Sequence, residues 1–173
     1  MIHVSLKRAW FTAVLLTVAL LLCSFASGEG TADNLLYNGD FRLTDQDGMP
    51  DGWYTDAYIM TTGYTQFSLL DDADQEHGNA AEIHNFGLND ARFVQGVDVE
   101  PDTVYCLSGY IRASGVENGR GANLSVEGVY AFSESVYETN GEWEYIEYYG
   151  ETGPDQDYII VYARLGDEQE AVQ

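Results

Sequence analysis

The sequence predicts an all-β fold, a two-sheet antiparallel β-sandwich that follows an apolar N-terminal leader. Short runs rich in Val, Ile, Tyr and Phe alternate with clusters of Gly, Asn and Asp, which is the pattern of strands separated by turns. No amphipathic helical stretch of useful length follows the leader. Roughly nine such runs at this spacing are typical of a sandwich rather than of a helical or parallel fold.

The leader has the pattern of an export signal. Lys7 and Arg8 precede an uncharged apolar run, 9–26, that ends in small residues at Ser24-Phe25-Ala26. The run lies at the lower edge of the about 17–25 apolar residues that span a bilayer as a helix. Two interpretations therefore stay open, a cleaved signal peptide and a retained membrane anchor. In both, the rest of the chain lies outside the cytoplasm, either secreted or anchored to the membrane.

We divide the chain into a signal or anchor at 1–26, a linker at 27–33 and one domain at 34–173, which is too short for two domains. The exported part has five arginines against 29 acidic residues, a formal charge of −24. Such a charge repels nucleic acid, and it limits any membrane association to the N-terminal segment. Cys106 is the single cysteine beyond the leader, so no intramolecular disulfide is expected. We expect a monomer.

The expected strands follow in chain order. The first four, at 34–41, 54–59, 66–70 and 80–86, are separated by turn residues at 48–50 and 76–79 among others. The fifth and sixth, at 92–99 and 104–113, flank the tight turn Glu100-Pro101-Asp102. The last three, at 122–129, 142–149 and 158–165, are preceded or separated by Asn-Gly pairs at 118–119 and 140–141.

Alternation predicts which side chains of two strands face the core. In 104–113 the inward set is Tyr105, Leu107 and Ile111, and the outward set is Cys106, Ser108, Tyr110 and Arg112. In 158–165 the inward set is Ile159, Val161, Ala163 and Leu165, and the outward set is Tyr158, Ile160, Tyr162 and Arg164. Tyrosine–arginine patterns on outward faces are unusual for strands that are simply solvated.

Four motifs in order resemble the cellulase-C-type carbohydrate-binding modules, the combined families four and nine. The opening run 34–41 with Asn38-Gly39-Asp40-Phe41, then Gly52-Trp53, the hairpin 95–110 around Pro101, and Gly141-Glu142-Trp143 carry the likeness over nearly the whole exported part. The resemblance implies a galactose-binding-like jelly roll with Trp53 and Trp143 in its core. It implies a non-catalytic accessory module that binds an oligo- or polysaccharide.

Two departures from the family matter. Arg42 stands where the family has a glutamate that helps to hold structural calcium, so we expect no cofactor and at most weak calcium binding. The family's closing strand is also missing after Leu165-Gly166. We therefore expect the chain to be part of a longer protein, because a missing last strand would leave an exposed sheet edge.

Sugar recognition needs aromatic planes for the C–H faces and planar polar groups for the hydroxyls. The expected ligand-binding set on outward strand faces is Tyr110, Arg112, Tyr158, Tyr162 and Arg164, with Tyr58, Tyr64 and Tyr130 at loops or strand ends. We expect Tyr110, Arg112, Tyr162 and Arg164 to share one surface patch.

Two other functions stay open. One is a structural or interaction ectodomain of a membrane protein, for instance a glycosyltransferase. The other is a small glycoside hydrolase, which would need a paired-carboxylate cleft. No acidic residue stands in an apolar run that would raise its pKa, and Cys106 has no recognisable base, so we expect no catalysis.

Overall fold

A computed structural model describes residues 5–9, 34–74, 78–116 and 119–166. This part of the chain is all-β and antiparallel, and it contains no helix long and apolar enough to cross a membrane. The strands are β1 Ser5–Ala9, β2 Tyr54–Ala57, β3 Thr65–Asp74, β4 Gly78–Asn85, β5 Ala91–Asp98, β6 Val104–Ile111, β7 Ala122–Val126, β8 Glu144–Glu151 and β9 Tyr158–Leu165.

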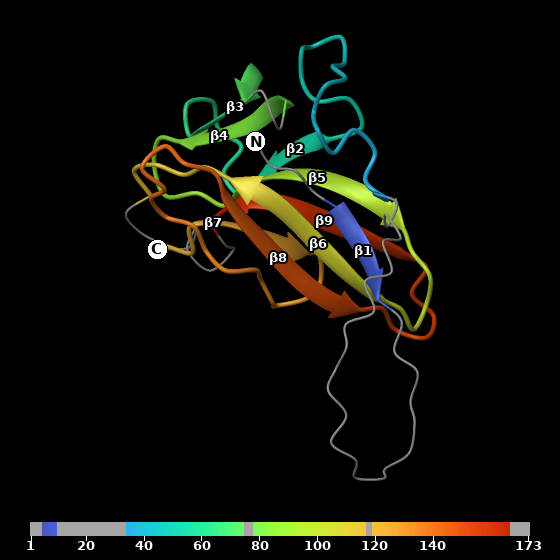
Figure 1. Cartoon of the computed structure of the whole chain (residues 1–173). Helices are drawn as coiled ribbons and strands as arrows, with labels where there is room; N and C mark the ends of the chain where they lie inside the picture. Colours follow the sequence, from blue (N-terminus) through green and yellow to red (C-terminus); the bar gives the residue numbers. More distant parts are fainter. Residues whose placement is uncertain (1–4, 10–33, 75–77, 117–118, 167–173) are drawn as a thin grey trace.

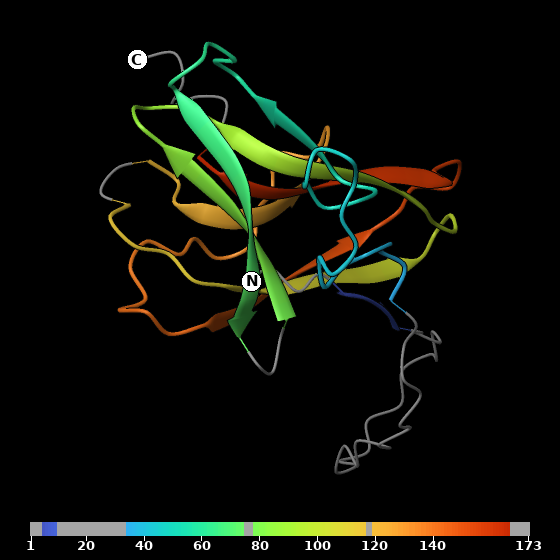
Figure 2. The same cartoon turned by 90° about the horizontal axis from the view of Figure 1, so that it is seen from above.

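Two sheets face each other as the layers of a β-sandwich-like fold. One has the strand order β2-β5-β9-β7 and the other β1-β6-β8, and the two layers are separated in the view from above (Figures 1 and 2). The strands β3 and β4 form a separate hairpin at one end of the sandwich (Figure 1). The predicted all-β antiparallel architecture is therefore confirmed.

The core lies between the two sheets. Apolar side chains from β5, β7 and β9 meet those from β6 and β8, among them Phe93, Leu124, Val161, Leu107 and Ile146. Each is at most 6% exposed. The inward sets predicted for 104–113 and 158–165 are confirmed, since all of these side chains but Leu165, which is partly buried, are buried. Burial of this kind stabilises a domain by roughly 1.5–3 kcal/mol for each large apolar side chain.

The prediction of a first strand at 34–41 is wrong. Residues 37–40 form a turn, in which Asn38 has the left-handed φ of 51°. The Asn38 amide Nδ2 donates to the carbonyls of Leu43 at 2.8 Å and Asp51 at 2.9 Å. Asparagine tolerates this backbone conformation and bonds to nearby backbone, so the Asn-Gly pair bends the chain instead of extending it.

β1 is a strand that the sequence did not predict, and it lies inside the expected leader. Its five residues pair antiparallel with β6, from Ser5 opposite Ser108 to Ala9 opposite Val104 (Figure 1). Residues 10–33, which hold the apolar run and the linker, lie outside the described residues. Cleavage of the leader and its insertion into a membrane both stay predictions, and either would remove β1 from the edge of β6.

The β3–β4 hairpin packs onto the core at the end of the sandwich. Phe67 of β3 meets Phe93 of β5 edge-to-face, with ring centroids 5.3 Å apart, and Ala81 of β4 is buried in the same cluster. Such a ring pair contributes about 0.5–1.5 kcal/mol beyond the buried area. The hairpin thereby forms one wall of a cleft described below.

Candidate functional site

The outer surface of the β2-β5-β9-β7 sheet carries a group of aromatic and charged side chains. The strand register places Tyr54 beside Val94, Val94 beside Tyr162, and Arg92 beside Arg164. Because Phe93, Val161 and Ala163 point into the core, their neighbours along β5 and β9 point to the opposite side. We call this surface the tyrosine face and define it by Tyr54, Asp56, Arg92, Tyr158 and Tyr162.

Two tyrosines of this face present open aromatic surface. Tyr158, the first residue of β9, is 51% exposed. Its ring lies across Gly96 of β5. A Cβ atom at Gly96 would collide with the Tyr158 ring, so the glycine is what allows the ring to lie along the sheet. Tyr54 on β2 is 54% exposed. Rings held in this way offer planes on which a sugar can stack.

A network of charged side chains fixes the end of the face nearest the cleft. Asp90 is fully buried and accepts two hydrogen bonds from Arg164, from Nε and Nη2 at 2.6 Å each. Arg92 donates to Asp56 from Nε at 2.8 Å and Nη2 at 2.6 Å, and it reaches Asp90 at 3.2 Å. Bidentate pairs hold both guanidinium groups in one orientation.

Tyr162 lies under this network rather than in open solvent. The Arg92 guanidinium sits 4.7 Å from the centre of the Tyr162 ring, and the phenol donates to Glu127 at 2.9 Å. Burial, followed by that hydrogen bond, raises the pKa of Tyr162 to about 12. Burial and then the nearby Tyr158, Glu127 and Asp56 raise the pKa of Tyr54.

The β7 side of the face is closed by the segment that follows β7. Phe132 pairs with Ser125 through an isolated bridge, and the Arg120 guanidinium lies 4.0 Å from the centre of its ring. The side chains of Asn123 and Ser125 are buried there, and Asn123 Oδ1 and Ser125 Oγ find no hydrogen-bond partner among the described residues. The open part of the tyrosine face is therefore the part toward β2 and the start of β9.

The predicted single patch is wrong, because its members lie on different sheets. Tyr110 is on the outer side of β6, where its ring lies 5.2 Å from that of Tyr145 on β8. Arg112 follows the end of β6, whereas Tyr162 and Arg164 lie on β9 in the opposite sheet. Tyr162 and Arg164 are also only 7% and 6% exposed, so neither offers a free side chain to a ligand. On β9, Tyr158 is therefore the one predicted ligand-binding residue whose side chain is exposed.

The three predicted loop tyrosines are exposed and lie on separate segments. Tyr58 follows β2 and is 56% exposed, Tyr64 precedes β3, and Tyr130 follows β7. The Tyr130 ring meets Phe132 edge-to-face at 5.2 Å. Within the described residues, no hydrogen bond or ring contact joins these three side chains to one another, so the structure does not unite them into one site.

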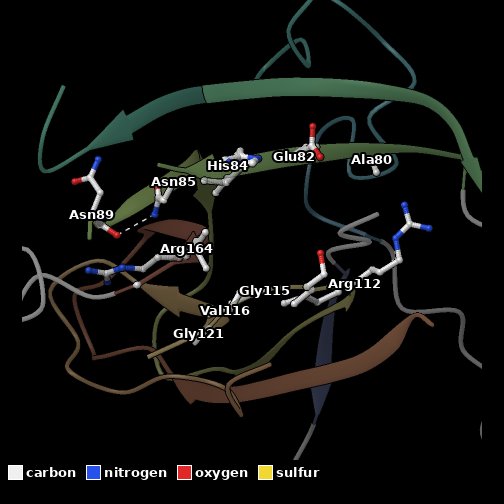
Figure 3. Close-up of a pocket in the computed structure, with 18 of the residues that line it drawn as sticks. Ala80, Glu82, His84, Asn85, Asn89, Arg112, Gly115, Val116, Gly121 and Arg164 are labelled. Atoms are coloured by element: carbon white, nitrogen blue, oxygen red, sulfur yellow. Dashed lines mark hydrogen bonds between the residues drawn. The ribbon is translucent and has the colours of Figure 1, made fainter. Parts of the chain in front are cut away.

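A second feature is a cleft of about 770 Å³ between β4 and the chain that follows β6, which we call the β4 cleft. Figure 3 shows Glu82 and His84 of β4 on one side and Arg112, Gly115 and Val116 on the other. The Asn85 side chain donates to the Asn89 carbonyl at 3.0 Å at one end.

Trp143 also lines the β4 cleft, which corrects its expected place in the core. It is half-buried, and the Arg112 guanidinium lies 4.6 Å from the centre of its ring. Trp53, by contrast, is 6% exposed and packs edge-to-face on Phe41, as a core residue. The Asn-Gly turn at 140–141 leaves Trp143 just before β8, at the rim rather than between the sheets.

Tyr54, Arg92 and Asp90 are the site residues that the sequence interpretation missed. Tyr54 and Asp56 alternate in the predicted strand 54–59, so the same period-two argument used for 158–165 would have placed them on one face. Asp90 gave no such signal, because it lies in a polar loop and its partner Arg164 is 74 residues away.

The described residues include no group of three or more His, Cys, Asp or Glu side chains that could hold a metal ion. Arg42 instead pairs with Asp40 at 3.1 Å. In comparisons with known proteins, the chain matches no family and no curated protein. The resemblance to the cellulase-C-type modules therefore stays a prediction from the sequence.

Proposed function

We propose that this chain is a non-catalytic, extracytoplasmic module that binds a glycan chain on the tyrosine face of a jelly-roll sandwich. The observation that carries the proposal is the Tyr158 ring, which lies across Gly96 with half of its surface open, beside the equally open Tyr54. Exposed aromatic planes on a rigid sheet match the C–H faces of sugar rings, and Asp56 supplies carboxylate oxygens beside them for hydroxyls.

The expected binding is weak and needs a chain rather than a single sugar. Each aromatic contact contributes roughly 1 kcal/mol, so two rings alone hold one sugar poorly. A polysaccharide that occupies several positions along the sheet would reach a Kd on the order of micromolar to millimolar. No residue is assigned to bond cleavage in this proposal.

The test is retention on polysaccharides. We expect Tyr54→Ala combined with Tyr158→Ala to abolish retention, while the melting temperature changes little because both side chains are about half exposed. The matched control is Tyr149→Ala, since Tyr149 is 56% exposed on β8 of the opposite sheet. This control should bind like the wild type.

Two outcomes would reject the proposal. A folded wild-type protein that is retained by none of a broad panel of plant, microbial and animal glycans favours the interaction-ectodomain alternative. Equal loss of retention in the Tyr149 control and the double variant would place binding elsewhere. Release of reducing sugar from any of these glycans would instead favour the hydrolase alternative.

A further inference from the structure

Among the residues that the structure describes, Arg112 in the β4 cleft has no carboxylate partner. Arg42 pairs with Asp40, Arg92 with Asp56, and Arg164 with Asp90. Within the part of the chain that the structure describes, the only interaction of Arg112 is the contact of its guanidinium with Trp143 at 4.6 Å. Its five N–H donors therefore remain available to a ligand.

This absence of a partner is notable because the exported part has 29 acidic residues against five arginines. A carboxylate near Arg112 would be easy to supply on such a surface. Instead, Trp143 holds the guanidinium by a cation–π contact, which orients the planar group and leaves its edges free. The Glu138 carboxylate, which reaches the cleft-lining Gly115, accepts hydrogen bonds from the backbone N–H groups of Gly115 and Asn140.

The opposite wall adds a second uncommitted donor. His84 on β4 is exposed, and within the described residues its imidazole makes no hydrogen bond or ion pair; its ring lies 4.5 Å from the centroid of the Phe86 ring. Glu82, also on this wall, accepts a hydrogen bond from Ser68 at 2.6 Å. Two aromatic side chains, Trp143 and Phe86, also line the cleft. Figure 3 shows the two nitrogen donors, Arg112 and His84, on its opposite walls.

We propose that the β4 cleft is a second binding site, which recognises a carboxylate-bearing sugar, a uronic acid unit of a glycan. The Arg112 guanidinium would take the carboxylate through paired N–H donors, which is the geometry that guanidinium and carboxylate share. The rings of Trp143 and Phe86 would contact the C–H faces of the sugar. The site is separate from the tyrosine face.

The acidity of the domain does not prevent this contact. Repulsion between exposed charges is largely screened beyond about 8 Å at physiological ionic strength. The paired hydrogen bonds of Arg112 act at contact distance, where screening matters less. The same acidity disfavours loose, non-specific anion binding, so the site should prefer a ligand that fits the cleft to a simple anion.

The experiment compares a trimer of galacturonic acid, its methyl ester and the neutral galactose trimer, by NMR titration that follows the Trp143 indole signal. We expect the acid to bind at least tenfold more tightly than either neutral form. Arg112→Gln should remove this preference, and Arg112→Lys should keep part of it, because lysine retains the charge without the paired donors. The melting temperature of each variant verifies folding.

The tyrosine-face variant separates this proposal from the proposed function. Tyr54→Ala with Tyr158→Ala should leave the preference for the acid trimer unchanged. Equal affinity for the acid and neutral trimers would overturn the proposal, as would a preference that survives in Arg112→Gln. Acetate that shifts the Trp143 signal at the same concentration as the trimer would overturn the assignment to a sugar.

Discussion

Asp90 shows how strongly one residue can depend on distant partners. Its carboxylate is fully buried and lies between two guanidinium groups, those of Arg164 at 2.6 Å and Arg92 at 3.2 Å. A buried charge of this kind is tolerated only because its partners compensate for lost hydration. The network also holds Arg92 over the Tyr162 ring, so it fixes one end of the tyrosine face.

We expect Asp90→Asn to lower the free energy of unfolding by about 3–5 kcal/mol, since Arg164 would remain buried without its counter-charge. The matched control is Asp56→Asn. The Asp56 side chain is 43% exposed, so losing its pair with Arg92 should cost no more than about 1 kcal/mol. Urea denaturation measures both. Similar losses of unfolding free energy in the two variants would show that burial of an ion pair does not determine how much it stabilises this fold.

At the residue scale, the sequence predicts well to which side of a strand each side chain points. It predicts poorly which residues that side chain contacts. Alternation placed Leu107, Ile111 and Val161 in the core, because a strand with one buried side has a period of two. The same rule predicts that Tyr162 and Arg164 point away from the core. The structure agrees, because they alternate along β9 with Val161 and Ala163, which point into the core. The rule could not show that Asp90 and Phe132 contact Arg164, or that Arg92 lies over Tyr162, since these partners come from other segments of the chain.

Eight of the nine expected strands correspond to strands of the structure, and the differences have local causes. The missing one, 34–41, contains Asn38-Gly39, whose turn chemistry outweighed its apolar neighbours. β3 continues to Asp74, beyond the expected end at residue 70, because pairing with β4 extends a segment of low strand propensity. Elements with clear alternation and turn residues at both ends, such as β5 and β9, were the most predictable.

Whether one edge of β6 is paired depends on whether the leader, which contains β1, is cleaved. β6 pairs with β8 on one side and with β1 on the other, across residues 104–108. In a chain that begins at residue 27, the β6 backbone groups that face β1 would lose their partners. An edge of this kind is open to pairing with another strand.

We expect amide hydrogen exchange, measured by NMR, to reveal that edge. In the shortened chain, alternate amides of residues 104–108 should exchange faster than in the full chain, and those that donate to β8 should stay protected. Amides of β5 serve as the control, because β5 is flanked by β2 and β9 in both chains. Uniform protection of residues 104–108 in the shortened chain would mean that another segment covers the edge.

For the whole molecule, the arrangement of strands in the two sheets decides which side chains can act together. Strand alternation does not reveal which sheet a strand joins, so Tyr110 and Tyr162 looked alike although they lie on opposite outer surfaces. Sheet order depends on pairings between residues far apart in the chain, such as Gln95 with Val161 in β5 and β9. One consequence is that the tyrosine face and the β4 cleft are separate surfaces, which can be altered independently.

The net charge leads to a prediction for the molecule as a whole. The chain beyond residue 26 has a formal charge of −24, and self-repulsion of such a charge destabilises the folded state unless dissolved salt screens it. We therefore expect the melting temperature to rise by several degrees between about 10 mM and about 500 mM sodium chloride, over which the screening length falls below about 10 Å.

Calcium separates general screening from a specific site. Arg42 pairs with Asp40 near the first turn, and its positive charge opposes a divalent cation there. Micromolar calcium barely changes the ionic strength, so it should leave the melting temperature unchanged at either salt concentration. A ligand that binds only the folded state raises stability by mass action. A rise of several degrees in the melting temperature at micromolar calcium would therefore demonstrate a specific site. For the salt prediction, a melting temperature independent of sodium chloride would show that self-repulsion does not limit the stability of this domain.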